Sequence, residues 1–159
     1  MDFFLEFFMK KILCIDDEPQ NYSFIVDICA DIPQIQMFTA NDVRNALEII
    51  EDQGNIDIVI TDIFIPTGGD LRDMIGPRAR KYEENLRHLG GLIILDALEI
   101  LTPIPKIITY TACTDFELLE VLGAHVSLRL PKPSPTDVLL NAILQFIEDQ
   151  DEEDPRWIL

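Results

Sequence analysis

The chain has 159 residues, which is the size of one ordinary domain and enough to bury a hydrophobic core. Hydrophobic residues make up 48% of the sequence, a share that argues against disorder over most of its length. The 29 acidic residues outnumber the 12 basic ones and give a net charge of −17, so the surface repels nucleic-acid phosphates and anionic lipid. We therefore expect no nucleic acid and no membrane as partners, and expect instead a cation or a basic protein surface.

The cysteines and histidines show no pattern of a disulfide framework or a zinc site. The chain has an odd number of cysteines, Cys14, Cys29 and Cys113, and none of them has CxxC spacing. We interpret all three as reduced structural residues, which predicts a cytoplasmic protein. His88 and His125 lie far apart in the sequence, which disfavours a metal site built from histidine and cysteine.

We interpret residues 1–9 as an N-terminal extension. Its DFFLEFF segment is too short to span a bilayer and lacks the positive region that opens a signal peptide. Phe3 with Phe7, and Phe4 with Phe8, have helical i, i+4 spacing. That spacing leaves two readings open: docking on a neighbour or on a second copy in a homodimer, or an extension with no role.

Apolar runs alternate with helical patterns across residues 10–150. The predicted strands are Ile12–Ile15, Ile35–Phe38, Ile56–Thr61, Lys106–Tyr110 and Val126–Leu130. The predicted helices are Pro19–Ala30, Val43 to Gly54 with Asn41 or Asp42 as cap, Leu92–Leu101, about Thr114 to Leu122, and a last helix carrying Val138 to Ile147. Five alternations of strand and helix predict a doubly wound α/β fold with a five-stranded parallel sheet, followed by an acidic C-terminal tail, 151–159.

Polar side chains follow four of the five predicted strands, at the edge where ligands bind in doubly wound sheets. They are Asp16 and Asp17, Asp62, Thr111 and Lys132. Clustered carboxylates raise one another's pKa unless a cation lies among them, and Mg²⁺ needs only a few carboxylates and waters. With Mg²⁺ bound, Asp62 is a candidate nucleophile towards phosphorus, and Lys132 and Thr111 are candidate contacts to the phosphoryl oxygens.

Each of these residues also has an ordinary structural explanation. Acids after a strand are common as solvated helix starts, and a threonine at a strand end reflects β propensity. Their joint occurrence at the ends of the correct strands favours the site.

Four segments resemble the motifs of response regulator receiver domains, the CheY-like modules of two-component signalling systems. They are Ile12–Pro19 (ILCIDDEP), Ile58–Pro66 (IVITDIFIP), Ile107–Ala112 (IITYTA) and Leu130–Pro133 (LPKP). The resemblance covers about Lys10 to Asp149 and implies a flavodoxin-like (βα)5 fold. It also implies that Asp16 and Asp17 hold Mg²⁺ with Asp62 and the backbone carbonyl of Phe64. Asp62 would accept a phosphoryl group from a histidine kinase or histidine phosphotransfer protein.

The resemblance further implies that Thr111 is the switch hydroxyl, that Lys132 contacts the phosphoryl group, and that the Lys132–Pro133 bond is cis. Receivers usually carry an aromatic residue three positions before this lysine, where Arg129 stands. The usual coupling between threonine and aromatic residue is therefore in doubt. Phe64, two residues after Asp62, predicts slow self-dephosphorylation.

A second departure is the insertion 67–90, whose 24 residues compare with about 4–6 in a typical connection. Its latter part is predicted to be helical, started by Gly76-Pro77 and stopped by Gly90-Gly91. It holds five of the twelve basic residues: Arg72, Arg78, Arg80, Lys81 and Arg87. We expect either a lid or partner-docking element beside Asp62, or a surface elaboration packed by its own apolar stripe. The stripe consists of Ile75, Ala79, Tyr82, Leu86 and Leu89.

The leading interpretation is a stand-alone receiver, not an enzyme, that signals by changing shape to a downstream protein that the sequence does not identify. The alternative is a receiver-like scaffold that binds partners without phosphorylation, which the altered switch and the insertion favour. A Mg²⁺-dependent phosphatase with an aspartyl intermediate ranks last, because its leaving-group acid is expected where Phe64 stands.

Overall fold

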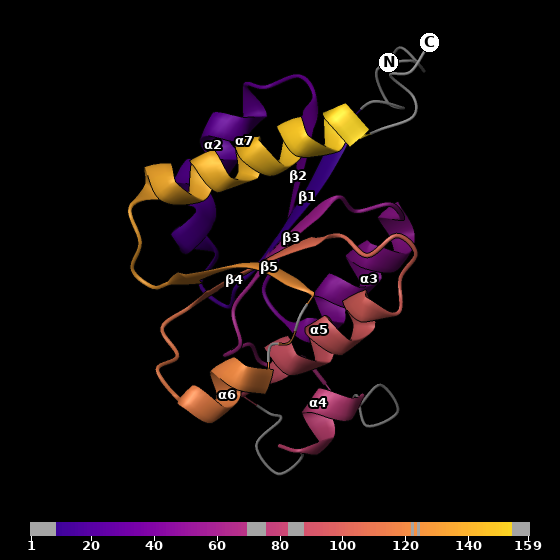
Figure 1. The fold of residues 1–159 in the computed structure, drawn as a ribbon, viewed down its shortest axis with the longest axis vertical. Helices are drawn as coiled ribbons and strands as arrows, with labels where there is room; N and C mark the ends of the chain where they lie inside the picture. The colour runs from indigo at the N-terminus through magenta and orange to yellow at the C-terminus, as the bar shows by residue number, and fades with distance from the viewer. Residues whose placement is uncertain (1–8, 70–75, 83–87, 122, 124, 154–159) are drawn as a thin grey trace.

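The computed structural model describes residues 9–69, 76–82, 88–121, 123 and 125–153, with the backbone alone for 151–153. Its centre is a five-stranded, all-parallel sheet in the order β2-β1-β3-β4-β5 (Figure 1). The strands are β1 (Lys10–Ile15), β2 (Ile35–Ala40), β3 (Ile58–Thr61), β4 (Lys106–Thr111) and β5 (Val126–Pro131). The predicted flavodoxin-like sheet is confirmed.

Helices cover both faces of the sheet (Figure 1). A 3-10 turn η1 (Pro19–Tyr22), α2 (Ser23–Ala30) and α7 (Thr136–Glu153) lie on one face. The other face carries α3 (Val43–Gln53), α4 (Pro77–Arg80), α5 (Gly90–Glu99) and α6 (Phe116–Val121). No helix among the residues that the structure describes is long and apolar enough to cross a membrane.

Two hydrophobic cores separate the sheet from its two helical layers. Alternate residues of a strand point to opposite faces, so Leu13 and Ile15 enter the core under α3 and α5. Ile12 and Cys14 enter the core under α2 and α7. Both sets are fully buried, which explains why the strands read as continuous apolar runs.

Local signals in the sequence set the bounds of α3. Asp42 caps its N-terminus, where the carboxylate Oδ1 accepts a hydrogen bond of 2.7 Å from the Asn45 N–H. Gly54 ends it with φ 59°, a backbone conformation that suits glycine. The predicted helix Pro19–Ala30 is divided instead: its first turn is η1, in which the Asn21 N–H donates to the carbonyl of Glu18, and α2 begins at Ser23.

The start of α5 differs from its prediction. The glycine pair Gly90-Gly91 was expected to stop a helix, but it begins α5, two residues before the predicted start at Leu92. Gly90 and Gly91 donate backbone hydrogen bonds of 2.8 and 3.0 Å to the carbonyls of Ile65 and Ile63. A Cβ atom on Gly91 would collide with the carbonyl oxygen of Asp62, so only glycine allows this close approach.

The insertion forms a short element outside α5. Its described helix is the single turn α4, shorter than the pattern predicted. Ala79 is fully buried and Tyr82 packs against the core, as their places in the predicted stripe require. Residues 70–75 and 83–87 lie outside the described residues, and so do Arg72 and Arg87 and the predicted contacts of Ile75 and Leu86.

The predicted domain limits are not tested at either end. The aromatic pairs of residues 3–8 and positions 154–159 of the predicted tail lie outside the described residues. The last helix, α7, continues through Glu153, past the expected boundary at 150.

Candidate functional site

Parallel strands bring their carboxyl ends to one edge, and the predicted site residues meet there. Asp16 follows β1, and Asp62 follows β3, where its N–H donates to the carbonyl of Ile15 at 3.4 Å. Thr111 ends β4, and its carbonyl accepts a hydrogen bond of 2.9 Å from the N–H of Lys132 after β5. Backbone hydrogen bonds therefore join adjacent strand ends and fix the positions of the candidate side chains.

The central feature of this edge is a lysine shared by two buried carboxylates. The Lys132 ammonium donates to Asp16 Oδ2 and, at 2.8 Å, to Asp62 Oδ2. The side chains of Lys132, Asp16 and Asp62 are 16%, 0% and 7% exposed. Burial would lower the pKa of Lys132, but the hydrogen bonds and charges of the two carboxylates raise it above its usual value. The lysine is therefore charged at neutral pH.

Backbone and amide donors fix the remaining carboxylate oxygens. The Glu18 N–H donates to Asp16 Oδ1 at 2.9 Å, and the Asn21 amide donates to Asp16 Oδ2 at 3.4 Å. The Phe64 N–H donates to Asp62 Oδ1 at 3.2 Å. Each oxygen of Asp62 thus has a donor in a defined direction, which holds the carboxylate in one orientation.

Asp17 lies exposed beside this cluster. Its pKa is raised by partial desolvation, by a hydrogen bond with Asp16, and by the negative charges of Asp16 and Glu18. A divalent cation would relieve that repulsion, and carboxylate oxygens are the ligands that Mg²⁺ prefers. The donors suit Mg²⁺ by chemical type alone, because no three His, Cys, Asp or Glu side chains of the described ranges stand close enough together to hold a metal ion.

Thr111 is buried at the end of β4, and its Oγ1 accepts a hydrogen bond of 3.2 Å from the Cys113 N–H. Phe64 is 41% exposed on the loop after Asp62. The Lys132–Pro133 bond is cis, as the sequence resemblance implied. The structure therefore brings Asp16, Asp62 and Lys132 into contact at the predicted edge of the sheet. The roles of these residues stay predictions.

The insertion contributes a structural clamp that the sequence did not reveal. The Arg78 guanidinium donates to Asp96 Oδ1 at 3.0 Å. It also donates to both carboxylate oxygens of Glu99, to Oε2 at 2.6 Å and to Oε1. Its Nε donates to the carbonyl of Val121 at 2.6 Å. One side chain of α4 therefore joins α5 to the end of α6.

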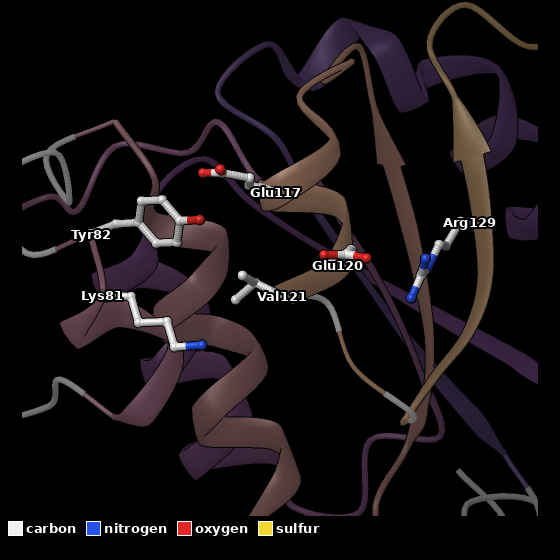
Figure 2. A pocket seen from close by; sticks show the side chains of 6 residues that line it. All are labelled: Lys81, Tyr82, Glu117, Glu120, Val121 and Arg129. Carbon is white, nitrogen blue, oxygen red and sulfur yellow. The ribbon is translucent and has the colours of Figure 1, made fainter.

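An open pocket of about 670 Å³ lies between the insertion, α6 and β5 (Figure 2). Figure 2 shows Lys81 and Tyr82 on the insertion side, Arg129 on the β5 side, and α6 between them. The lining residues are Lys81, Tyr82, Glu117, Glu120, Val121 and Arg129. Arg129, the departure at the switch position, is thus exposed at a pocket rather than packed in the core.

No family model matches the sequence, and no curated protein matches it. Solved structures do match over nearly the whole chain. The receiver domain of a putative LuxO repressor from Vibrio parahaemolyticus is 19% identical, with a TM-score of 0.64 over 94% of this chain and 98% of that chain. The receiver domain of an HD-domain protein from Pseudomonas fluorescens Pf-5 is 20% identical, with a TM-score of 0.66 over 91% and 98%.

A CheY-like receiver domain protein from Methanospirillum hungatei JF-1 is 19% identical, with a TM-score of 0.65 over 91% of this chain and 98% of that one. These coverages leave no major element of the neighbours unmatched. The chain therefore has the fold of a response regulator receiver domain.

Proposed function

We propose that the chain is a receiver that accepts a phosphoryl group on Asp62 and signals to a partner protein by a conformational change. The observation that carries this proposal is the lysine held between two buried carboxylates at the carboxyl edge of the sheet. In this proposal Asp62 is the nucleophile, Lys132 is the fixed cation and Asp16 is an oxygen ligand, and the hydrogen bonds among the three side chains support these roles. The receiver fold of the neighbouring structures supports the same function.

The transfer forms a bond between an Asp62 oxygen and phosphorus, while the bond from phosphorus to the donor group breaks. A phosphohistidine of a kinase or phosphotransfer protein is the proposed donor. The Phe64 N–H orients Asp62 for the attack. The phosphoryl group carries a charge of about −1.5 to −2. The Lys132 ammonium then binds a phosphoryl oxygen, and its bond to Asp16 weakens.

Asp16, Asp17, Asp62 and the carbonyl of Phe64 are the proposed ligands of Mg²⁺. When bound, the ion supplies charge neutralisation for the carboxylates and the phosphoryl oxygens. The Thr111 hydroxyl, now an acceptor from Cys113, is the proposed donor to the remaining phosphoryl oxygen. Its turn towards the phosphoryl group would break this bond and alter the loop leading to α6. A cytoplasmic location is part of the proposal, and the three buried free cysteines support it.

The direct test is incorporation of label from radiolabelled acetyl phosphate with Mg²⁺ and with EDTA. We expect label in the wild type and in Asp27→Asn, a control at an exposed aspartate of α2. We expect none in Asp62→Asn and none with EDTA. Label in Asp62→Asn equal to that of the wild type would overturn the proposal.

Phe64→Asn is expected to shorten the lifetime of the phosphorylated protein severalfold. Phe64 is a half-exposed apolar side chain beside Asp62, and an amide there would bind and orient water. The decay of label after removal of acetyl phosphate measures the lifetime. Equal decay in the variant and the wild type would contradict this assignment. The phenylalanine at position 64 also argues against phosphatase activity, because it cannot protonate a leaving group.

A scaffold that acts without phosphorylation is the second candidate. The pocket favours it, because Lys81 and Arg129 line it together with Glu117 and Glu120. The ion pairs among the described residues involve other side chains. Hydrogen exchange with and without beryllofluoride and Mg²⁺ separates the two functions. A switch predicts altered protection in α6 and β5, whereas unaltered protection with beryllofluoride bound would favour the scaffold.

A further inference from the structure

Tyr110 lies directly under the lysine of the site. It belongs to β4 and packs into the core under α2 and α7, on the opposite sheet face from Thr111. The Lys132 ammonium is 5.4 Å from the centre of the Tyr110 ring. The ammonium therefore has carboxylates of Asp16 and Asp62 as hydrogen-bond partners and an aromatic face as a further neighbour.

The ring itself is fixed from two sides. Tyr22 is almost fully buried, and its ring centre is 6.1 Å from that of Tyr110 at a tilt of 52°. The Tyr110 hydroxyl accepts a hydrogen bond of 3.4 Å from the N–H of Ser134, in the turn after Lys132. The tyrosine thus contacts both the ammonium and the backbone of the segment that carries it.

An aromatic face attracts a cation without claiming any of its hydrogen bonds. This matters because Lys132 is a flexible chain whose three donors are needed by carboxylate and phosphoryl oxygens. When a phosphoryl group joins Asp62, the ammonium must change partners without leaving the site. The ring face is the neighbour that can stay the same before and after the transfer.

We propose that Tyr110 is a positioning residue for phosphoryl transfer, whose ring face holds the Lys132 ammonium at Asp62. The inference rests on the proposed function, because it assigns Lys132 to the reaction at Asp62. A purely structural tyrosine would act through its bulk and its hydroxyl. The proposed role acts through the electron-rich face of the ring, and this difference is measurable.

The experiment compares phosphorylation rates from acetyl phosphate with Mg²⁺ in a series at position 110. Tyr110→Phe keeps the ring and is expected to stay within about twofold of the wild type, whereas Tyr110→Leu is expected to lose about threefold to thirtyfold. Phenylalanines carrying one, two or three ring fluorines keep the shape of the ring and withdraw electron density from its face. The phosphorylation rate should therefore fall with each added fluorine. Equal rates across the fluorinated series would overturn the proposal, even if Tyr110→Leu fails to fold.

A second readout does not depend on phosphorylation. In the wild type and in Tyr110→Phe, the ring should shift the NMR signals of the Lys132 Cε protons upfield, and Tyr110→Leu should remove this shift. Absence of the shift in the wild type would overturn the placement of the ammonium over the ring. A wild type that shows the shift but takes up no phosphoryl group would overturn the proposed function and this inference about rate, while leaving the contact intact.

Discussion

One ammonium group forms hydrogen bonds with two carboxylates that arrive on different strands. Asp16 and Asp62 are almost fully buried, and Lys132 reaches both of them from the end of β5. Removal of one partner from a buried ion pair leaves an uncompensated charge in a poorly solvated place. The stability of the folded edge therefore depends on Lys132 as much as the proposed chemistry does.

Lys132→Met is expected to lower the free energy of unfolding by about 3 kcal/mol in EDTA, and Mg²⁺ should restore part of it. The pKa of Lys132 is raised in the folded state, so its contribution is complete below its ordinary value of 10.5 and is lost only as pH rises through the folded value. Chemical denaturation at pH 7 therefore captures the whole effect. Lys81→Met, at an exposed lysine, is the control, and equal losses in both variants would contradict this account.

At the scale of elements, the start of α5 packs against the backbone that carries Asp62. Gly91→Ala is expected to destabilise the protein by about 1–3 kcal/mol, because the added methyl collides with the Asp62 carbonyl oxygen. Helix propensity alone would give the opposite sign, since alanine is favoured over glycine in helices by about 1 kcal/mol. Thermal unfolding decides between the two, and a stabilised variant would refute the close approach.

The clamp of Arg78 predicts coupling between the insertion and α6. Its side chain is 13% exposed, and those of Asp96 and Glu99 are 5% and 23% exposed. Arg78→Met should cost about 3 kcal/mol of stability and increase hydrogen exchange in α6. A double-mutant cycle with Glu99→Met should give a coupling energy of about 1 kcal/mol or more. A coupling near zero would show that the ion pair between Arg78 and Glu99 does not stabilise the attachment of α4 to α5.

Local patterns in the sequence were sufficient to locate the strands and the polar residues at their ends, but not the starts of α2 and α5. Apolar runs located all five strands, Gly54 marked the end of α3, and the cap was predicted to be Asn41 or Asp42, of which the structure shows Asp42. The side of the sheet on which Asp16, Asp62 and Lys132 meet follows from parallel pairing, which the alternation of elements already implied.

Contacts across elements were not predictable in the same way. Arg78 reads as one more basic residue of a solvated helix until α5 places Asp96 and Glu99 beside it. The helix start at Gly90 depends on the approach of α5 to the β3 loop, a tertiary feature that a pair of glycines does not specify. The contact of Tyr110 with Lys132 joins β4 to the turn after β5, and the tyrosine at that position indicates only β propensity in the sequence.

At the scale of the whole molecule, the net charge is −17, so any salt can stabilise the fold by screening repulsion. Stabilisation by specific Mg²⁺ binding must therefore be separated from this screening. Specific Mg²⁺ binding at ten times its Kd should add about 1.4 kcal/mol to the free energy of unfolding. Asp17→Asn should lose most of this gain, because Asp17 is the exposed carboxylate beside Asp16. Asp27→Asn should keep it. The measurement is thermal unfolding against NaCl of equal ionic strength, and the same stabilisation by NaCl would exclude a specific site.

The central claim, that Asp62 carries the phosphoryl group, is tested most directly by chemical trapping. The protein is incubated with acetyl phosphate and Mg²⁺, treated with borohydride to reduce any acyl phosphate to an alcohol, and digested for peptide mass analysis. The account predicts homoserine in place of aspartate at position 62 and unaltered aspartate at positions 16 and 17. Homoserine at another position, or an unaltered peptide around residue 62 from a folded protein, would contradict it.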